Sequence, residues 1–324
     1  MNKKSAIPPF LVQNRCPARS LVLTAGILLT ACCQMATGAV IDLSKPVSES
    51  LTPDGIYWNF DGGTLGGSTP DPVKDESGNG YDGILGKGRD DRPMPTYGSG
   101  KYGTAIYLNG NSGTLADPSI RWNGTGTDDN TKLVYTGAGF TGGAWINFSS
   151  VSTGTQDVII FERGMSVFDP TVGNFYSLQL FRGSVGTWRL RLRVGNNTSV
   201  PVSFLSAETT NVFESLGAWN HVGFTFDIGS TESVLQFWLN GEKFGDPIST
   251  TFKFETTTTG LQRSFSVGER TLAGNSNFNG FIDDVFVTGG VHAFAIPEPG
   301  VAALLLPLLG WMGVRMRRRG LKHP

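Results

Sequence analysis

The chain has 324 residues, of which 44 are glycine and 16% are charged, and its formal net charge is −1. Residues 40–296 contain 17 Lys and Arg against 26 Asp and Glu, a net charge of −9. An acidic domain is a poor candidate for nucleic-acid binding, because neutralising phosphates requires clustered basic side chains. All three cysteines lie within the first 33 residues, and the chain has three histidines. A disulfide, a cysteine-ligated zinc, a thiol nucleophile and a histidine-cluster metal site are therefore excluded for residues 40–296.

The first 39 residues have the composition of a secretory signal peptide. They contain four basic residues and no acidic residue, an eleven-residue apolar run at 21–31, and small residues that end at Ala39. These are the three parts of a signal peptide, and the apolar run is too short to span a bilayer. We expect residues 1–39 to be removed by cleavage after Ala39. The alternative is a lipobox-like segment in which Cys32 is lipidated.

Between the two ends, apolar and polar residues alternate with period two, which is the pattern of β-strands. The clearest segment is 188–194, where Trp188 and three aliphatic residues alternate with three arginines. Strands are predicted, in chain order, at 56–60, 105–108, 144–148, 158–162, 175–181, 188–194, 220–226, 234–239, 265–268 and 281–287. Asn240 and Gly241 tolerate positive φ and predict a hairpin turn. Strands this short and numerous, without a helical period, predict two packed antiparallel sheets.

Five segments add a family resemblance to this fold class. They are DESGNGYDGIL at 75–85, GKYGTAIYLNG at 100–110, FTGGAWI at 140–146, WNHVGFTFD at 219–227 with LNG at 239–241, and GFIDDV at 280–285. In this order and spacing they resemble the LamG-like, concanavalin A-like jelly-roll family. The resemblance covers about residues 56–287 and implies an all-β, two-sheet antiparallel jelly-roll sandwich, which we place at 40–292. The polar stretch that usually follows the last strand is replaced here by the C-terminal tail.

The resemblance also implies a structural Ca²⁺ that ties the first strand region to the last. By alternation, Asp283 falls on the side of the last predicted strand that faces the apolar core, where a carboxylate needs a partner. Carboxylate oxygens in loops suit Ca²⁺, and the matching positions are Asp61 and Asp283, joined by Asp75. The alternative is that Asp283 caps backbone amides at a strand end.

Two features suggest carbohydrate binding. Arg189, Arg191 and Arg193 share one strand face and could bind the carboxylates or sulfates of an anionic polysaccharide. The alternative is a solvated face paired with acidic neighbours on adjacent strands. Trp122, in the polar segment 119–132, is the best candidate for an exposed, sugar-stacking ring. His221 matches a common family position, and without a paired carboxylate it is expected to be a hydrogen-bonded structural residue.

The sequence does not predict an enzyme. Laminarinase-type glycosidases of this fold carry a Glu-x-Asp-x-Glu strand, whereas Glu162 and Glu208 stand alone in this sequence. We predict a non-catalytic protein of the exopolysaccharide or biofilm matrix, which binds a matrix glycan or another matrix component. One alternative is a secreted glycan-active enzyme, a glycosidase or lyase. Another is a purely structural matrix protein with no ligand beyond calcium.

The C-terminal segment 293–324 has three consecutive parts: a Pro-Glu-Pro motif, an apolar run at 301–314 and a basic cluster. The positive-inside rule keeps the basic cluster cytoplasmic and the domain outside. The combination resembles the PEP-CTERM sorting signal, which implies a hydrophobic helix held transiently in the inner membrane and processing by an exosortase-type enzyme. By that resemblance the sorting residues are Pro297, Glu298, Pro299, Arg315, Arg317, Arg318 and Arg319. The expected location is the cell surface or extracellular matrix, and an ordinary C-terminal anchor is the alternative.

Overall fold

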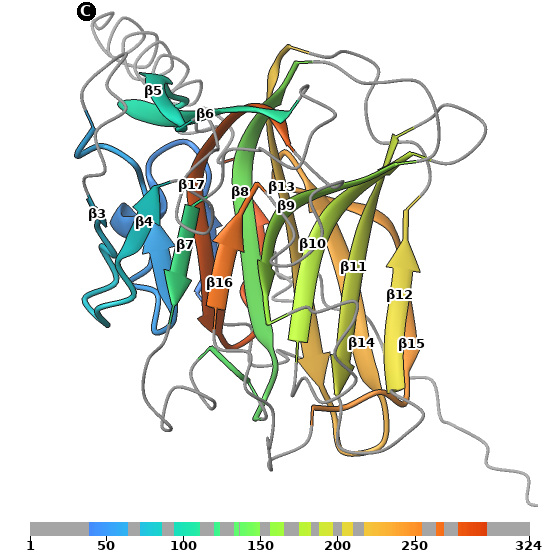
Figure 1. The fold of residues 1–324 in the computed structure, drawn as a ribbon. Coiled ribbons are helices and arrows are strands. Elements are labelled where there is room, and N and C mark those ends of the chain that lie inside the picture. The colour runs from blue at the N-terminus through green and yellow to red at the C-terminus, as the bar shows by residue number, and fades with distance from the viewer. Residues whose placement is uncertain are drawn as a thin grey trace, which may run out of the picture. The chain divides into compact units, whose positions relative to one another are not determined.

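The computed structural model describes residues 39–63, 72–85, 94–110, 120–123, 133–135, 137–149, 156–164, 175–182, 188–196, 203–209, 217–254, 264–268 and 278–296. All of them belong to the compact unit Thr37–Pro324. They form eighteen strands and one short 3-10 helix, η1 (Val47–Glu49). The predicted all-β fold is confirmed (Figure 1).

One of the two large sheets is named here the β15–β5 sheet, and all its strand pairs are antiparallel. Its order is β15 (Glu242–Thr250), β14 (Ser233–Leu239), β13 (Trp219–Ile228), β8 (Phe140–Phe148), β17 (Asn279–Gly289), β6 (Thr104–Asn109) and β5 (Thr96–Ser99), and β2 (Ile56–Trp58) also pairs with β17. The strand β17, near the C-terminal end of the domain, lies between β8 and β6, so the chain returns to the middle of this sheet.

The other large sheet, the β12–β3 sheet, is also antiparallel throughout. Its order is β12 (Ser203–Glu208), β11 (Trp188–Asn196), β10 (Phe175–Arg182), β9 (Gln156–Arg163), β16 (Ser264–Val267), β7 (Ile120–Asn123), β4 (Gly83–Leu85) and β3 (Pro72–Val73). Here too a late strand, β16, is inserted between earlier ones. Pairing between strands distant in sequence is therefore common to both sheets.

The two sheets face each other across one hydrophobic core (Figure 1). Aromatic rings from opposite sheets meet in it. Trp58 of β2 contacts Phe265 of β16 at a centroid distance of 5.3 Å, and Phe148 of β8 contacts Trp188 of β11 at 5.0 Å. Burying such rings on the inner faces supplies most of the driving force for the sandwich.

All ten predicted strands are present, with ends shifted by a few residues. The hairpin is confirmed as well, because Asn240 and Gly241 have φ of 51° and 85° between β14 and β15. The alternation of β11 is also confirmed, since Trp188, Leu190, Leu192 and Val194 are all in the core. The strands that no alternating segment predicted are short or largely polar.

A second apolar cluster lies on the outer face of the β15–β5 sheet, where the ends of the domain cover it. β1 (Ile41–Asp42) pairs in parallel with β18 (Phe294–Ala295). Ile41, Leu43, Val47 and Phe294 are buried there. They pack on four sheet residues: Tyr57, Trp145, Trp238 and Phe286.

His221 lies in this second cluster and is fully buried. Its ring contacts Trp145 and Phe294 at centroid distances of 5.4 and 4.8 Å. Neither ring nitrogen has a hydrogen-bond partner among the described residues. Burial lowers the pKa of His221 to about 3, so the ring is neutral at pH 7. The prediction of a structural role fits this environment, but the expected hydrogen bond is not formed.

Candidate functional site: the outer face of the β12–β3 sheet

Polar side chains gather on the outer face of the β12–β3 sheet, opposite the core. Because Leu190, Leu192 and Val194 point into the core, Arg189, Arg191 and Arg193 point outward from β11. The three arginines therefore share one face, as the alternation predicted.

Arg191 is the centre of a charged network on this face. Its Nε and Nη2 both donate to Glu208 Oε1 of β12, at 2.9 and 2.5 Å, and its Nη1 donates to Asp157 Oδ1 of β9 at 2.6 Å. The guanidinium lies over the Phe181 ring, 3.4 Å from its centroid. Arg189 Nη1 contacts Glu208 Oε2 at 3.4 Å. Two of the three arginines, Arg189 and Arg191, are therefore paired with acids from adjacent and neighbouring strands, as the alternative in the sequence analysis expected.

A second row of polar residues crosses the same face one step along the strands. The register places Arg121 of β7 beside Ser266, Ser266 beside Glu162 of β9, Glu162 beside Ser177, and Ser177 beside Arg193. Glu162, Ser177 and Ser266 are fully buried. Sequence reasoning missed this row, because it exists only across strands, although Glu162 had been noted.

Trp122 is not the exposed ring that was predicted. It lies in β7 with 9% of its surface exposed, belongs to the core, and meets Tyr81 edge-on at a centroid distance of 4.9 Å. Its strand pairs with both β16 and β4, which turns Trp122 inward and Arg121 outward. The polar composition of the surrounding segment hid a core position.

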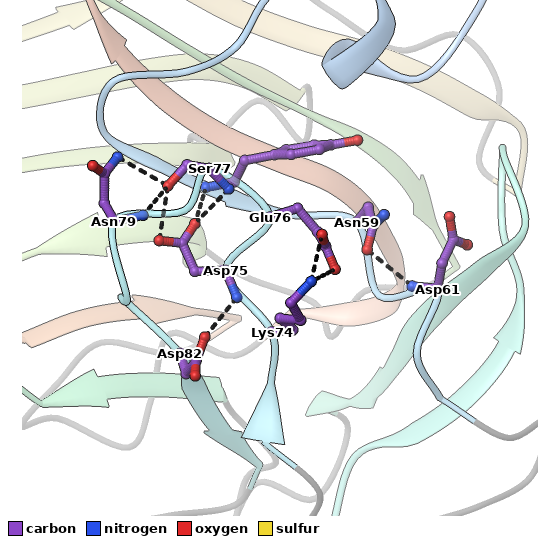
Figure 2. Close-up of polar contacts among 9 residues, drawn as sticks. Asn59, Asp61, Lys74, Asp75, Glu76, Ser77, Asn79 and Asp82 are labelled. Atoms are coloured by element: carbon purple, nitrogen blue, oxygen red, sulfur yellow. Dashed lines mark hydrogen bonds and ion pairs between the residues drawn. The ribbon is translucent and has the colours of Figure 1, made fainter.

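Asp75, one of the predicted calcium ligands, holds its own loop together. Its carboxylate accepts hydrogen bonds from the amides of Tyr57, Ser77 and Tyr81 at 3.0–3.1 Å and from the Ser77 hydroxyl at 2.8 Å. Figure 2 shows Asp75 turned toward Ser77, with Glu76 between it and Asp61 in that view. Buried carboxylates are stabilised by such amide donors, so Asp75 has a structural role.

Asp61 and Asp283 are brought to one turn, the one that joins β5 to β6. Asp283 Oδ2 accepts from the amides of Lys101 and Tyr102 at 2.8 and 3.1 Å, and Asp61 Oδ1 accepts from the Thr104 amide at 2.8 Å. Gly103, at φ +56°, leaves no room for a β-carbon, which would lie 1.9 Å from Asp61 Oδ1. The two carboxylates therefore stabilise this turn by accepting hydrogen bonds from backbone amides near its start and its end.

The predicted parity of Asp283 is wrong, because β17 contains a bulge. The register against β8 shifts between Asp283 and Phe286, and Asp284 has φ of +48°. Val285 lies in the main core, whereas Asp283 pairs with Trp145, a residue of the outer cluster. Burial and the neighbouring Asp284 raise the pKa of Asp283 to about 8. An extra residue reverses the inward and outward sides of a strand.

The predicted calcium ligands are not gathered as one set. Among the residues that the structure describes, no three His, Cys, Asp or Glu side chains are grouped to hold a metal ion. The Asp75 and Asp283 oxygens face amide donors, which account for their burial without an ion. The described residues do not fit a three-carboxylate site, and calcium binding stays a prediction.

The sorting residues Pro297, Glu298, Pro299, Arg315, Arg317, Arg318 and Arg319 lie outside the described residues, as does the leader up to residue 38. Within the described ranges, no helix has the length and apolar character to cross a membrane.

Comparison with solved structures finds matches at low identity and low TM-score. The bacteriophage CBA120 tailspike protein 2 domain is 16% identical over 60% of this chain and 27% of its own length, with a TM-score of 0.40. The chain thus spans about a quarter of that protein. The carbohydrate-binding module CBM40 of Ruminococcus gnavus IT-sialidase is 14% identical over 48% and 78%, with a TM-score of 0.37. A Bacteroides ovatus mixed linkage glucan GH16 protein is 13% identical over 72% and 95%, with a TM-score of 0.34.

No curated protein sequence matches the chain. The sequence profile of the concanavalin A-like lectin/glucanases superfamily (Laminin_G_3) matches residues 123–291, which is more than half of the chain. That segment runs from the end of β7 to just beyond β17, through the central strands of both sheets. The chain therefore belongs to the concanavalin A-like lectin/glucanases superfamily.

Proposed function

We propose that this protein is an exported, non-catalytic carbohydrate-binding protein of a cell surface or extracellular matrix, and that it binds a glycan on the outer face of the β12–β3 sheet. The observation that carries the proposal is the Arg191 network with Asp157 and Glu208, of which both acids keep about a quarter of their side-chain surface exposed. Paired guanidinium and carboxylate groups offer donors and acceptors side by side, as sugar hydroxyls require.

The test is binding of the purified full chain to an array of matrix glycans, compared with an Arg191→Met variant. Removing the guanidinium should weaken binding at least about tenfold, because both carboxylates lose the group that orients them. Lys243→Met on the exposed strand β15 is the matched control and should bind like wild type. Equal binding by wild type and Arg191→Met would place the glycan elsewhere.

A glycan-active enzyme is the second candidate, and the buried Glu162 favours it. A carboxylate fully buried in a polar row, beside Ser177 and Ser266, is a position where a general acid could act. Release of reducing sugar from the same glycans measures this activity directly. Loss of release in Glu162→Gln, with glycan binding retained, would favour the enzyme over the binding protein.

Export and C-terminal sorting are proposed from the ends of the domain. The first strand, β1, begins two residues after Ala39, and the last strand, β18, ends two residues before Pro297. Cleavage at both expected places would therefore leave the strands intact. In a host with the processing enzyme, replacing Pro297 and Pro299 with Ala should leave a heavier, membrane-held form; identical mass and location would contradict the sorting role.

A further inference from the structure

We propose that the outer face of the β12–β3 sheet selects uncharged glycans over anionic ones, and that Asp157 and Glu208 set this selectivity. The inference rests on the proposed carbohydrate binding and specifies its ligand class. It departs from one of the two readings of the three arginines in the sequence analysis, in which they could bind an anionic polysaccharide.

The first step is that the Arg191 charge is already neutralised within the protein. Three donor contacts join it to Glu208 and Asp157 at 2.5–2.9 Å, and 12% of its side chain is exposed. Charge-assisted contacts of this length are among the strong hydrogen bonds in proteins. An incoming carboxylate or sulfate would have to replace one of these acids at the guanidinium.

The second step is that the network cannot open easily. Asp157 pairs with Phe181 of β10, and Phe181 pairs with Arg189 of β11, so the Arg191 side chain reaches Asp157 over the Phe181 ring. The ring, 3.4 Å below, supports the guanidinium plane in that position. Acids from two strands and a ring from a third therefore fix the orientation of Arg191, and reorienting it toward an external anion would break all three contacts.

The third step concerns the rest of the face. Arg189 shares Glu208, and Glu162 lies between Arg121 and Arg193 in the transverse row. Arginines and acids are thus interspersed across the described strands of this face. An anionic chain that approached Arg189 or Arg191 would also meet the partly exposed carboxylates of Asp157 and Glu208, and like charges at close range oppose binding.

An uncharged hydroxyl has no such conflict. It can donate to Asp157 or Glu208 and accept from a guanidinium N–H without displacing either group. A chain rich in hydroxyls fits a surface on which both kinds of partner lie a few ångströms apart. The chemistry of this face therefore matches a neutral polysaccharide.

The test uses the full chain with six-sugar probes of both classes: cellohexaose, laminarihexaose and mannohexaose as neutral chains, and hexagalacturonate and a heparin hexasaccharide as anionic ones. Wild type should bind at least one neutral probe about tenfold more tightly than either anionic probe, with an affinity that changes little between about 50 and 500 mM salt. The double variant Asp157→Asn, Glu208→Gln keeps the side-chain shapes and exposes the guanidinium charge. It should gain anionic binding that weakens with salt and should lose the neutral preference.

A matched control makes the same change of charge on the other sheet. Asp227 and Glu242 are exposed on β13 and β15, so Asp227→Asn, Glu242→Gln removes two negative charges away from the face. Circular dichroism and melting temperature verify that each variant folds. Tight, salt-sensitive binding of an anionic probe by wild type, or unchanged selectivity in the Asp157 and Glu208 double variant, would overturn the inference while leaving carbohydrate binding intact. Absence of binding to either class would overturn both proposals.

Discussion

The two sheets of this sandwich present opposite outer faces to their surroundings. The β15–β5 sheet is covered by the protein's own ends, with Ile41, Leu43 and Phe294 sealed against aromatic side chains. The β12–β3 sheet carries arginines and acids joined across β9, β11 and β12. An apolar outer face covered by the chain itself is structural, whereas a polar face with its charges paired can exchange contacts with a polar ligand. One outer face is therefore structural, and the other is the face on which we propose glycan binding.

The largest expected effect comes from opening the covered face. Phe294→Ala removes a ring that is 2% exposed and packs on His221, Trp238 and Phe286, so unfolding should become easier by about 3–5 kcal/mol. Phe181→Ala on the polar face is the comparison and should cost about 1 kcal/mol. Urea titration of both variants measures the difference. A loss of about 1 kcal/mol or less in Phe294→Ala would show that the ends of the domain contribute little to stability.

The second prediction concerns pH and is specific to the covered face. The pKa of His221 falls from 6.5 to about 3 through burial. Above pH 6.5 the ring is neutral in both states, but below it the unfolded chain binds a proton that the folded chain excludes. The contribution of His221 to stability should therefore fall as pH drops from 6.5 toward 3, by about 2 kcal/mol between pH 7 and 5, whereas Asp283 and Asp284, whose pKa values are raised in the folded state, contribute in the opposite direction.

His221→Leu should remove that part of the pH dependence, as measured by urea midpoints at pH 7 and pH 5. His292→Gln is the matched control, because His292 is partly exposed and its ring nitrogens lie 3.1 and 3.0 Å from the carbonyl oxygens of Ala39 and Gly289. If the Leu variant retains the wild-type slope, the buried ring is not the source of the acid sensitivity.

The smallest expected effect is that of a chelator on the β5–β6 turn. Because amides of the turn already donate to Asp61 Oδ1 and Asp283 Oδ2, any Ca²⁺ bound there should contribute little to stability, and we expect excess EDTA to leave the melting temperature nearly unchanged. Asp283→Ala, in contrast, should destabilise by about 1–3 kcal/mol, since it leaves the Lys101 and Tyr102 amides without their acceptor. A melting temperature that falls by several degrees with EDTA and recovers with Ca²⁺ would instead support the calcium prediction.

Much of the fold followed from the sequence, because alternation is imposed by having one buried face. The inward set on β11 and the hairpin at Asn240 and Gly241 were both predicted correctly. Strands of two residues, such as β1, β3 and β18, are too short to show a period. They form because another strand of the protein supplies partners for their backbone hydrogen bonds, and a short sequence segment does not show which strand that is.

The candidate site depended more heavily on tertiary structure. Trp122 was assigned to the surface by its polar neighbours, but pairing of β7 with β16 and β4 buried it. The bulge at Asp284 turned Asp283 to the outer face, which alternation alone could not anticipate. In both cases the side that a residue faces was decided by strand pairing rather than by its local sequence.

The arginine ladder shows the division most clearly. The sequence by itself determined that Arg189, Arg191 and Arg193 lie on the same outward side of one strand, because the apolar residues that alternate with them must be buried. Only the tertiary structure decided what those charges meet. Asp157 and Glu208 lie 34 and 17 residues from Arg191 and reach it because β9 and β12 flank β10 and β11 in the sheet. Parity along a strand is a local consequence of burial, but charge pairing depends on which strands become neighbours, and the packing of the whole chain sets that order.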